Sequence, residues 1–117
     1  MTVVRIDHVQ LSIPPGGEAK ARAFYLDVLG LHEVPKPEAM RARGGMWFAE
    51  GIHLGVEENM HPLVKAHPAL VVTDLDALEA KLAAAGCEFK PALDQPGVRR
   101  GHTWDPFGNR IELVAAG

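Results

Sequence analysis

The first stretch of the chain alternates between apolar and polar residues. Between Val4 and Ile13, apolar side chains occupy one face, and polar side chains, His8 among them, occupy the other. A period of two is that of a β-strand with one buried face. The pattern therefore predicts a half-buried strand whose polar face is free to line a site.

Turn-forming residues end this strand, and apolar residues at helical spacing follow. Pro14–Gly17 interrupt the alternation, and an apolar stripe from Ala21 to Leu29 stops at Gly30, a residue suited to a helix C-terminus. A short strand at Leu31–Pro35 and a hairpin over Met46–Glu57 come next. The first half therefore has the predicted order βαβββ.

The second half repeats this order. Leu70–Val72 ends an apolar strand, Thr73 is the expected N-cap, and the helical stripe from Leu75 to Ala85 is closed by Gly86. Three more strands are expected after the helix, the last two joined by a turn: Cys87–Lys90, Arg99–Trp104 and Arg110–Val114.

The spacing of four polar residues supports an internal duplication. His53 follows His8 by 45 residues, and Glu112 follows His67 by the same 45. Recurrence of one interval between equivalent strands predicts two βαβββ modules, about 1–60 and 61–117, in a single α+β domain. We expect one curved mixed sheet with the helices on its convex side.

Length and composition narrow the function. A chain of 117 residues, 47% of them hydrophobic, fits one domain with one core. No apolar run approaches the roughly 20 residues needed to span a bilayer, no secretion signal opens the chain, and Cys87 is its one cysteine. We therefore expect a cytoplasmic protein without a membrane partner. The net charge of −3 and the scattered basic residues speak against nucleic acid, which leaves a small molecule or a second copy as partner.

The four residues of the duplication carry the candidate chemistry. His8, His53, His67 and Glu112 each lie on the polar face of a predicted strand. Because their apolar neighbours must pack against the helices, these side chains should converge on the concave face and hold one ion. Such a donor set suits Zn, Fe, Mn, Co or Ni and does not single one out. The alternative is a pocket of the same fold that binds ligand without metal.

Three phrases of the sequence resemble the vicinal oxygen chelate superfamily. They are Ile6–Val9, Ala23–Leu31 and Asp105–Leu113, they occur in this order, and the resemblance spans nearly the whole chain. The superfamily includes glyoxalase I, extradiol dioxygenases, fosfomycin-resistance transferases and bleomycin-binding proteins. The resemblance implies a glyoxalase-like fold and a homodimer that completes its cavities from two chains.

Because superfamily members take one metal ligand from each of several strands, the resemblance implies His8, His67 and Glu112 as the metal ligands. His53 stands on the strand that supplies a glutamate, the fourth ligand, in glyoxalase I-like members. A histidine there either binds the metal or contacts substrate, and this departure speaks against a specific lactoylglutathione lyase. Whether His8 meets the other two ligands within one chain or across a dimer stays open.

Further polar and aromatic residues are candidates for the same cavity. His102, on the penultimate strand, is with His53 a candidate acid or base. Arg100 alternates in phase with His102 and is the preferred substrate contact. Trp47 is interpreted as an apolar wall of the cavity, with core or dimer interface as the alternative. The remaining histidines and most other basic residues are interpreted as surface groups: His32, His61, Lys36, Arg41, Arg43 and Arg99.

The leading functional hypothesis is a metal-dependent enzyme. A divalent ion would chelate two neighbouring oxygens of a small substrate and stabilise the enolate or oxyanion that forms. Lyase, isomerase, dioxygenase and transferase chemistry all fit this scheme, because a fold alone does not choose among them. The alternative is a binding protein, similar to the bleomycin-sequestering members, that holds a compound in a dimer groove without transforming it.

Overall fold

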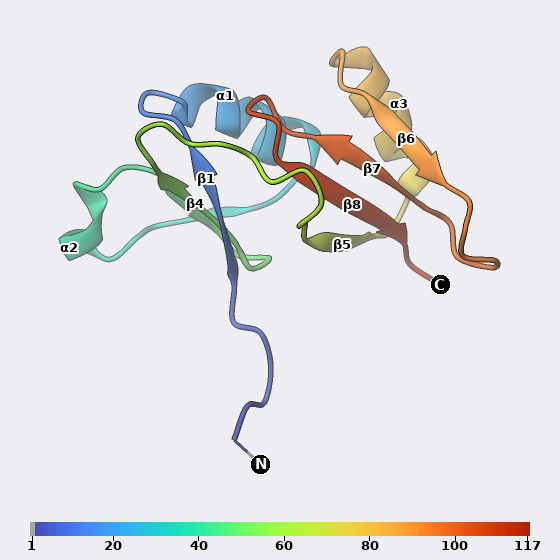
Figure 1. Cartoon of the computed structure of the whole chain (residues 1–117), viewed down its shortest axis with the longest axis horizontal. Helices are drawn as coiled ribbons and strands as arrows, with labels where there is room; N and C mark the ends of the chain where they lie inside the picture. The colour runs from blue at the N-terminus through green and yellow to red at the C-terminus, as the bar shows by residue number, and fades with distance from the viewer. Residues whose placement is uncertain (1) are drawn as a thin grey trace.

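A computed structural model describes residues 2–117 and shows two βαβββ halves (Figure 1). The strands of the first half are β1 (Val9–Ile13), β2 (Glu33–Val34), β3 (Met46–Phe48) and β4 (Ile52–Val56). Those of the second half are β5 (Ala69–Val72), β6 (Phe89–Ala92), β7 (Arg100–Trp104) and β8 (Arg110–Ala115). The predicted α+β fold with two modules is confirmed.

Each half forms its own four-stranded mixed sheet. The strand orders, β1-β4-β3-β2 and β5-β8-β7-β6, are equivalent, and in each the first and last strands of the module pair in parallel. The registers also correspond. His53 pairs with Gln10, two residues after His8, and Glu112 pairs with Ala69, two residues after His67. The structure thus supports the duplication, but it has two sheets where we expected one.

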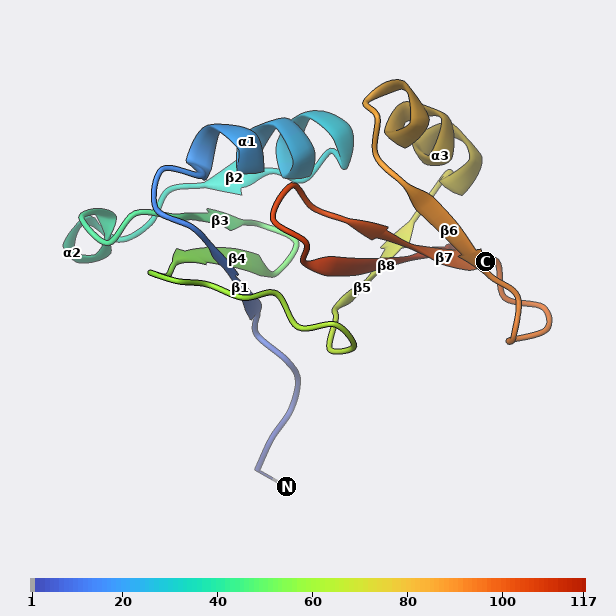
Figure 2. The same ribbon diagram turned by 45° about the horizontal axis from the view of Figure 1, so that its top comes forward.

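Helices cover one side of both sheets. In the first half α1 (Glu18–Arg22) continues directly into a π-helical stretch, η1 (Ala23–Val28), and a short α2 (Glu38–Arg41) lies in a segment without a predicted element. The second half contributes α3 (Leu75–Ala84). Figure 2 shows α1 and α3 above the same side of the strands.

The prediction of Thr73 as N-cap of the second helix is wrong by one residue. Asp74 occupies the cap, and its carboxylate accepts a hydrogen bond of 3.0 Å from the backbone N–H of Ala77. A carboxylate at this position satisfies an otherwise free N–H and also interacts favourably with the helix dipole. Both residue types suit an N-cap, so the sequence pattern did not separate them.

The core lies between the helices and the sheets. Alternate strand residues such as Ile52, Leu54, Ile111 and Leu113 are buried there together with Tyr25 of η1. Because neighbouring strand residues point to opposite faces, the residues between them face away from the helices. His53 and Glu112 fall in this second set, which is the placement that a shared site requires.

The first strand is shorter than predicted. It begins at Val9, whose N–H is bonded to Gly51 just before β4 starts, and residues 2–8 belong to no strand. Figures 1 and 2 show this segment extending away from the body of the chain. Val3, Val4 and Ile6 are 75%, 86% and 77% exposed. Within residues 2–117 no helix is long and apolar enough to cross a membrane.

Candidate metal centre and binding groove

Three donor side chains converge on the face of the second sheet that lies away from the helices. Glu112 of β8 pairs directly with His102 of β7, and His67 lies two residues before Ala69, which is the partner of Glu112 in β5. Their ligand atoms all lie within 4.8 Å of one another. Nε2 of His67 is 2.9 Å, and Nε2 of His102 is 3.5 Å, from the same atom, Oε1 of Glu112.

Burial and neighbouring charges favour the metal-binding protonation states of two members of this cluster, Glu112 and His102. Burial raises the pKa of Glu112, but the hydrogen bond with His67 and the charge of Arg100 outweigh it, so the net pKa lies below its usual value. Burial, followed by the charge of Arg110, lowers the pKa of His102. At neutral pH the carboxylate is therefore ionised and the His102 ring is neutral.

Both ring nitrogens of His67 face hydrogen-bond acceptors. Nδ1 lies 2.7 Å from the carbonyl oxygen of Lys65, and Nε2 lies 2.9 Å from Oε1 of Glu112. A carbonyl oxygen only accepts, so Nδ1 carries a proton. Nε2 is then the ring nitrogen directed at the Glu112 carboxylate. The donor set fits a divalent ion, because a histidine held through Nδ1–H presents its other nitrogen as a ligand.

His8 and His53 form a separate cluster on the first sheet. The rings of Trp47 and His53 are stacked with centroids 4.3 Å apart, and the His53 and His8 rings are stacked at 3.9 Å. Nδ1 of His8 also lies 2.8 Å from a carboxylate oxygen of Asp7. Burial, reinforced by the charge of His8, lowers the pKa of His53. Trp47 thus faces the sheet surface opposite the core, between the buried Met46 and Phe48.

Within the described residues of one chain, His8 does not join His67 and Glu112. The structure brings two of the three predicted ligands together and adds His102, which the sequence marked as an acid or base. The side chain of His8 is 41% exposed on its own half. Its assignment as a ligand therefore depends on a second copy of the chain.

Arg100 faces the cluster, as the alternation with His102 predicted. Its Nη1 lies 3.2 Å from Oε2 of Glu112, and its Nη2 donates to Asp94 at 2.6 Å. The guanidinium therefore holds the Glu112 carboxylate through the oxygen that does not face the histidines. A direct contact of Arg100 with substrate stays a prediction.

Arg110 belongs to the same surface and was not among the candidates. It precedes Glu112 by two residues on β8, so the two side chains share a face. Its Nη2 lies 3.1 Å from Nε2 and 3.4 Å from Nδ1 of His102. The alternation that selected Glu112 would have found Arg110 if it had been followed two residues toward the N-terminus.

Two open grooves meet at this cluster. The larger, about 600 Å³, runs over β6, β7 and β8 and includes His102 and Glu112 in its lining. The smaller, about 370 Å³, lies between β1 and the segment that leads into β5. His67 and Arg110 line both grooves. A ligand placed beside His67 in either groove would therefore contact the candidate metal centre.

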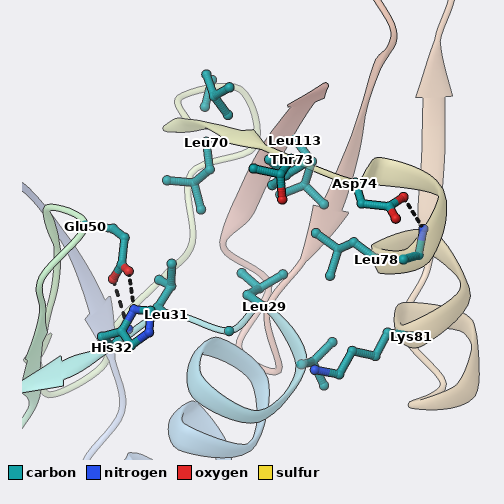
Figure 3. A pocket seen from close by; sticks show the side chains of 16 residues that line it. Leu29, Leu31, His32, Glu50, Leu70, Thr73, Asp74, Leu78, Lys81 and Leu113 are labelled. Carbon is teal, nitrogen blue, oxygen red and sulfur yellow. Dashed lines mark hydrogen bonds and ion pairs between the residues drawn. The ribbon is translucent and has the colours of Figure 1, made fainter. Parts of the chain in front are cut away.

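A cavity of about 680 Å³ lies elsewhere, between η1, β5 and α3 (Figure 3). Half of its lining residues are leucine or valine, and both of its carboxylates are already bonded. Glu50 accepts hydrogen bonds from the backbone and ring of His32, and Asp74 caps α3. No group of three metal-ligating side chains lies there among residues 2–117.

Comparisons with known proteins agree with the geometry. A family model described as "Glyoxalase/Bleomycin resistance protein/Dioxygenase superfamily" matches residues 5–113. The chain is 43% identical to a putative glyoxalase family protein from Bacillus anthracis, with 100% of this chain and 98% of that chain covered and a TM-score of 0.94. No curated protein matches the sequence.

More distant solved structures share the fold. The fosfomycin resistance protein FosX from Listeria monocytogenes is 17% identical, with 99% and 96% of the two chains covered and a TM-score of 0.77. TnmS3, an antibiotic binding protein from a Streptomyces species, is 22% identical, with 100% and 99% covered and a TM-score of 0.69. At these identities the likeness concerns the fold alone.

Proposed function

The chain belongs to the glyoxalase/bleomycin resistance protein/dioxygenase superfamily, and from that premise we propose that it is a metal-dependent enzyme acting on a small molecule with two neighbouring oxygens. The observation that carries the proposal is the convergence of His67, His102 and Glu112. Two imidazoles and one carboxylate are a donor set for a divalent transition metal that leaves coordination positions open. Fold membership alone would not support this chemistry.

His67 and Glu112 would hold the ion from one chain, and His8 of a second copy would complete the site. Three features support this arrangement. The His8 side chain is 41% exposed on its own half, the segment before it projects from the body of the chain, and that segment carries exposed valines and an isoleucine. Exposed apolar residues on an unpaired extended segment favour association with another chain. The proposed active form is therefore a homodimer with sites shared between subunits.

When bound, a divalent ion supplies Lewis-acid chemistry that polarises neighbouring substrate oxygens. The chain's own residues would position the substrate and move a proton. His102 is neutral and 3.5 Å from Glu112, which suits either a third ligand or a general base. Arg100 fixes the orientation of the Glu112 carboxylate. Trp47 and His53 would form a flat wall of the dimer cavity.

Metal content tests the proposal directly. Purified protein should take up one transition-metal ion per site, and Glu112→Gln, which keeps the shape but removes the charge, should weaken metal binding beyond the roughly 10–100-fold typical of an outer-shell change. Glu50→Gln is the matched control, because Glu50 pairs with His32 away from the cluster. The metallated protein is then screened with compounds that carry vicinal oxygens. Equal metal affinity of wild type and Glu112→Gln would refute the proposal.

A non-catalytic binding protein is the second candidate. The stack of Trp47, His53 and His8 supports it, because a planar compound could extend this column of parallel rings by stacking on the face of an end ring. The similarity to an antibiotic binding protein is consistent with this use of the fold. Protein that takes up no stoichiometric metal but binds planar compounds, and loses that binding in Trp47→Ala, would favour this function.

A further inference from the structure

Arg110 occupies the junction of the two grooves without a counter-ion. It lines both grooves together with His67. No carboxylate of residues 2–117 lies within ion-pair distance of its guanidinium, which instead contacts the ring of His102. An imidazole ring carries no negative charge, so the contact with His102 does not balance the charge of Arg110.

The contrast with Arg100 shows that this position is unusual. Both arginines are half-buried on the same face of the second sheet, Arg100 on β7 and Arg110 on the adjacent strand β8, on either side of the paired residues His102 and Glu112. Arg100 has two carboxylate partners, Asp94 and Glu112. Arg110 has no carboxylate partner among the described residues. The Nε atoms of both arginines are buried without a hydrogen-bond partner, so the missing carboxylate is what distinguishes Arg110. A half-buried arginine with unmet donors is a ready partner for an oxyanion.

The larger groove as a whole is positively charged, like the guanidinium of Arg110. Its lining contains four cationic side chains and two carboxylates, while the whole chain has a net charge of −3. The groove therefore concentrates positive charge that the rest of the chain lacks. The residues concerned are Lys65, Lys90, Arg100 and Arg110 against Asp94 and Glu112.

We propose that Arg110 binds an anionic group of the substrate, a carboxylate or a phosphate, that lies beyond the two oxygens addressed by the metal. This inference rests on the proposed function, because it places the anion beside the candidate metal centre. The planar guanidinium with its five donors matches the geometry of either anion. The substrate class is thus a small molecule with two neighbouring oxygens at one end and a negative charge at the other.

The test compares ligands that share one end and differ at the other. Malate, 3-phosphoglycerate and 2-hydroxybutyrate all present an α-hydroxy carboxylate, but only the first two carry a distal anion. Binding is measured by calorimetry on wild type, Arg110→Gln and the control Arg43→Gln, whose arginine is exposed on the first half. Each protein is used metal-loaded and metal-free, and its metal content is determined separately.

Wild type should bind malate or 3-phosphoglycerate at least about tenfold more tightly than 2-hydroxybutyrate. The tighter of the two identifies the anion as carboxylate or phosphate. Arg110→Gln should abolish this preference with unchanged metal content, and Arg43→Gln should keep it. If Arg110→Gln does not fold, Arg110→Lys tests the inference. Lysine keeps the positive charge but lacks the planar guanidinium, so this variant should lose part of the preference for the distal anion.

A wild type without any preference for the distal anion, or a preference that survives in Arg110→Gln or in full in Arg110→Lys, would overturn the inference. Failure of the proposed enzyme function is visible separately, as absence of metal uptake by wild type. In that case the metal-free comparison still shows whether Arg110 selects the distal anion.

Discussion

The hydroxyl of Tyr25 donates a 2.6 Å hydrogen bond to Oδ2 of Asp105, a residue 80 positions later in the chain. Tyr25 lies on η1 of the first half, and Asp105 opens the turn between β7 and β8 of the second half. Both residues are buried. Burial, followed by the charge of Asp105, raises the pKa of Tyr25, so the hydroxyl keeps its proton. This bond ties the two modules together through the core.

Removing this hydroxyl should weaken the protein. Tyr25→Phe is expected to lower the free energy of unfolding by about 1–3 kcal/mol, since the lost bond involves a charged acceptor. Denaturant unfolding of both proteins measures the difference. The control is Arg22→Gln, which breaks a surface ion pair with Glu33 that is worth at most about 1 kcal/mol. A Tyr25→Phe change no larger than that of the control would contradict the role of the bond.

Gly45 is expected to tolerate no side chain. It adopts φ +80°, and a Cβ there would overlap the carbonyl oxygen of Leu54 in β4. Gly86 has a similar φ of +75° but open space around it. Gly86→Ala should therefore cost about 1–2 kcal/mol of unfolding free energy, the price of the backbone conformation alone. Gly45→Ala should lower the unfolding free energy by clearly more than this, or prevent folding. Thermal unfolding of both variants measures the difference, and equal effects would argue against the close approach of Gly45 to Leu54.

The projecting N-terminal segment gives a prediction about assembly. Ile6 is 77% exposed in the single chain, and burial of such a side chain contributes about 1.5–3 kcal/mol. Ile6→Lys should shift a dimer toward monomer in sedimentation at micromolar concentration. Ala83→Lys, on the exposed side of α3, is the control that adds the same charge elsewhere. A wild type that sediments as a monomer would count against the shared site.

Acid should reduce the contribution of Glu112 to stability. Its pKa in the folded protein lies below the usual 4.5, so ionised Glu112 contributes stability that is present above the ordinary pKa and is lost as pH falls through the folded pKa. The difference in unfolding free energy between wild type and Glu112→Gln should therefore narrow from pH 6 toward about pH 3. Urea unfolding in metal-free buffer measures it. A constant difference would show that the charge is not stabilised by its neighbours.

His53 should not be required for metal uptake. Its ring is stacked between Trp47 and His8, so it is placed to support the neighbouring rings. His53→Gln is expected to keep metal affinity within about tenfold of wild type, while His67→Gln, which removes a proposed ligand, loses more. Competition with a chelating dye measures both affinities. Equal losses of metal affinity in the two variants would indicate that His53 is a fourth ligand.

Local patterns were sufficient for much of the fold. The alternation before Ile13, the helical stripe ending at Gly30 and the interval of 45 residues predicted both modules, and the equivalent registers of β1–β4 and β5–β8 agree with them. These predictions succeeded because strand and helix periodicity depends on neighbours in sequence. The same reasoning overestimated the length of the first strand, because Val4–His8 has no partner strand within residues 2–117.

The sequence by itself determined which side chains face away from the core, since alternation alone places His53, His67, His102 and Glu112 on one kind of surface. Only the tertiary structure decided which of them meet. His67, His102 and Glu112 converge through the β5–β8–β7 pairing, while His53 is stacked with His8 on the other sheet. The physical reason is that distances across a sheet, and the pairing of charges such as Arg100 with Glu112, depend on strands that are far apart in the chain.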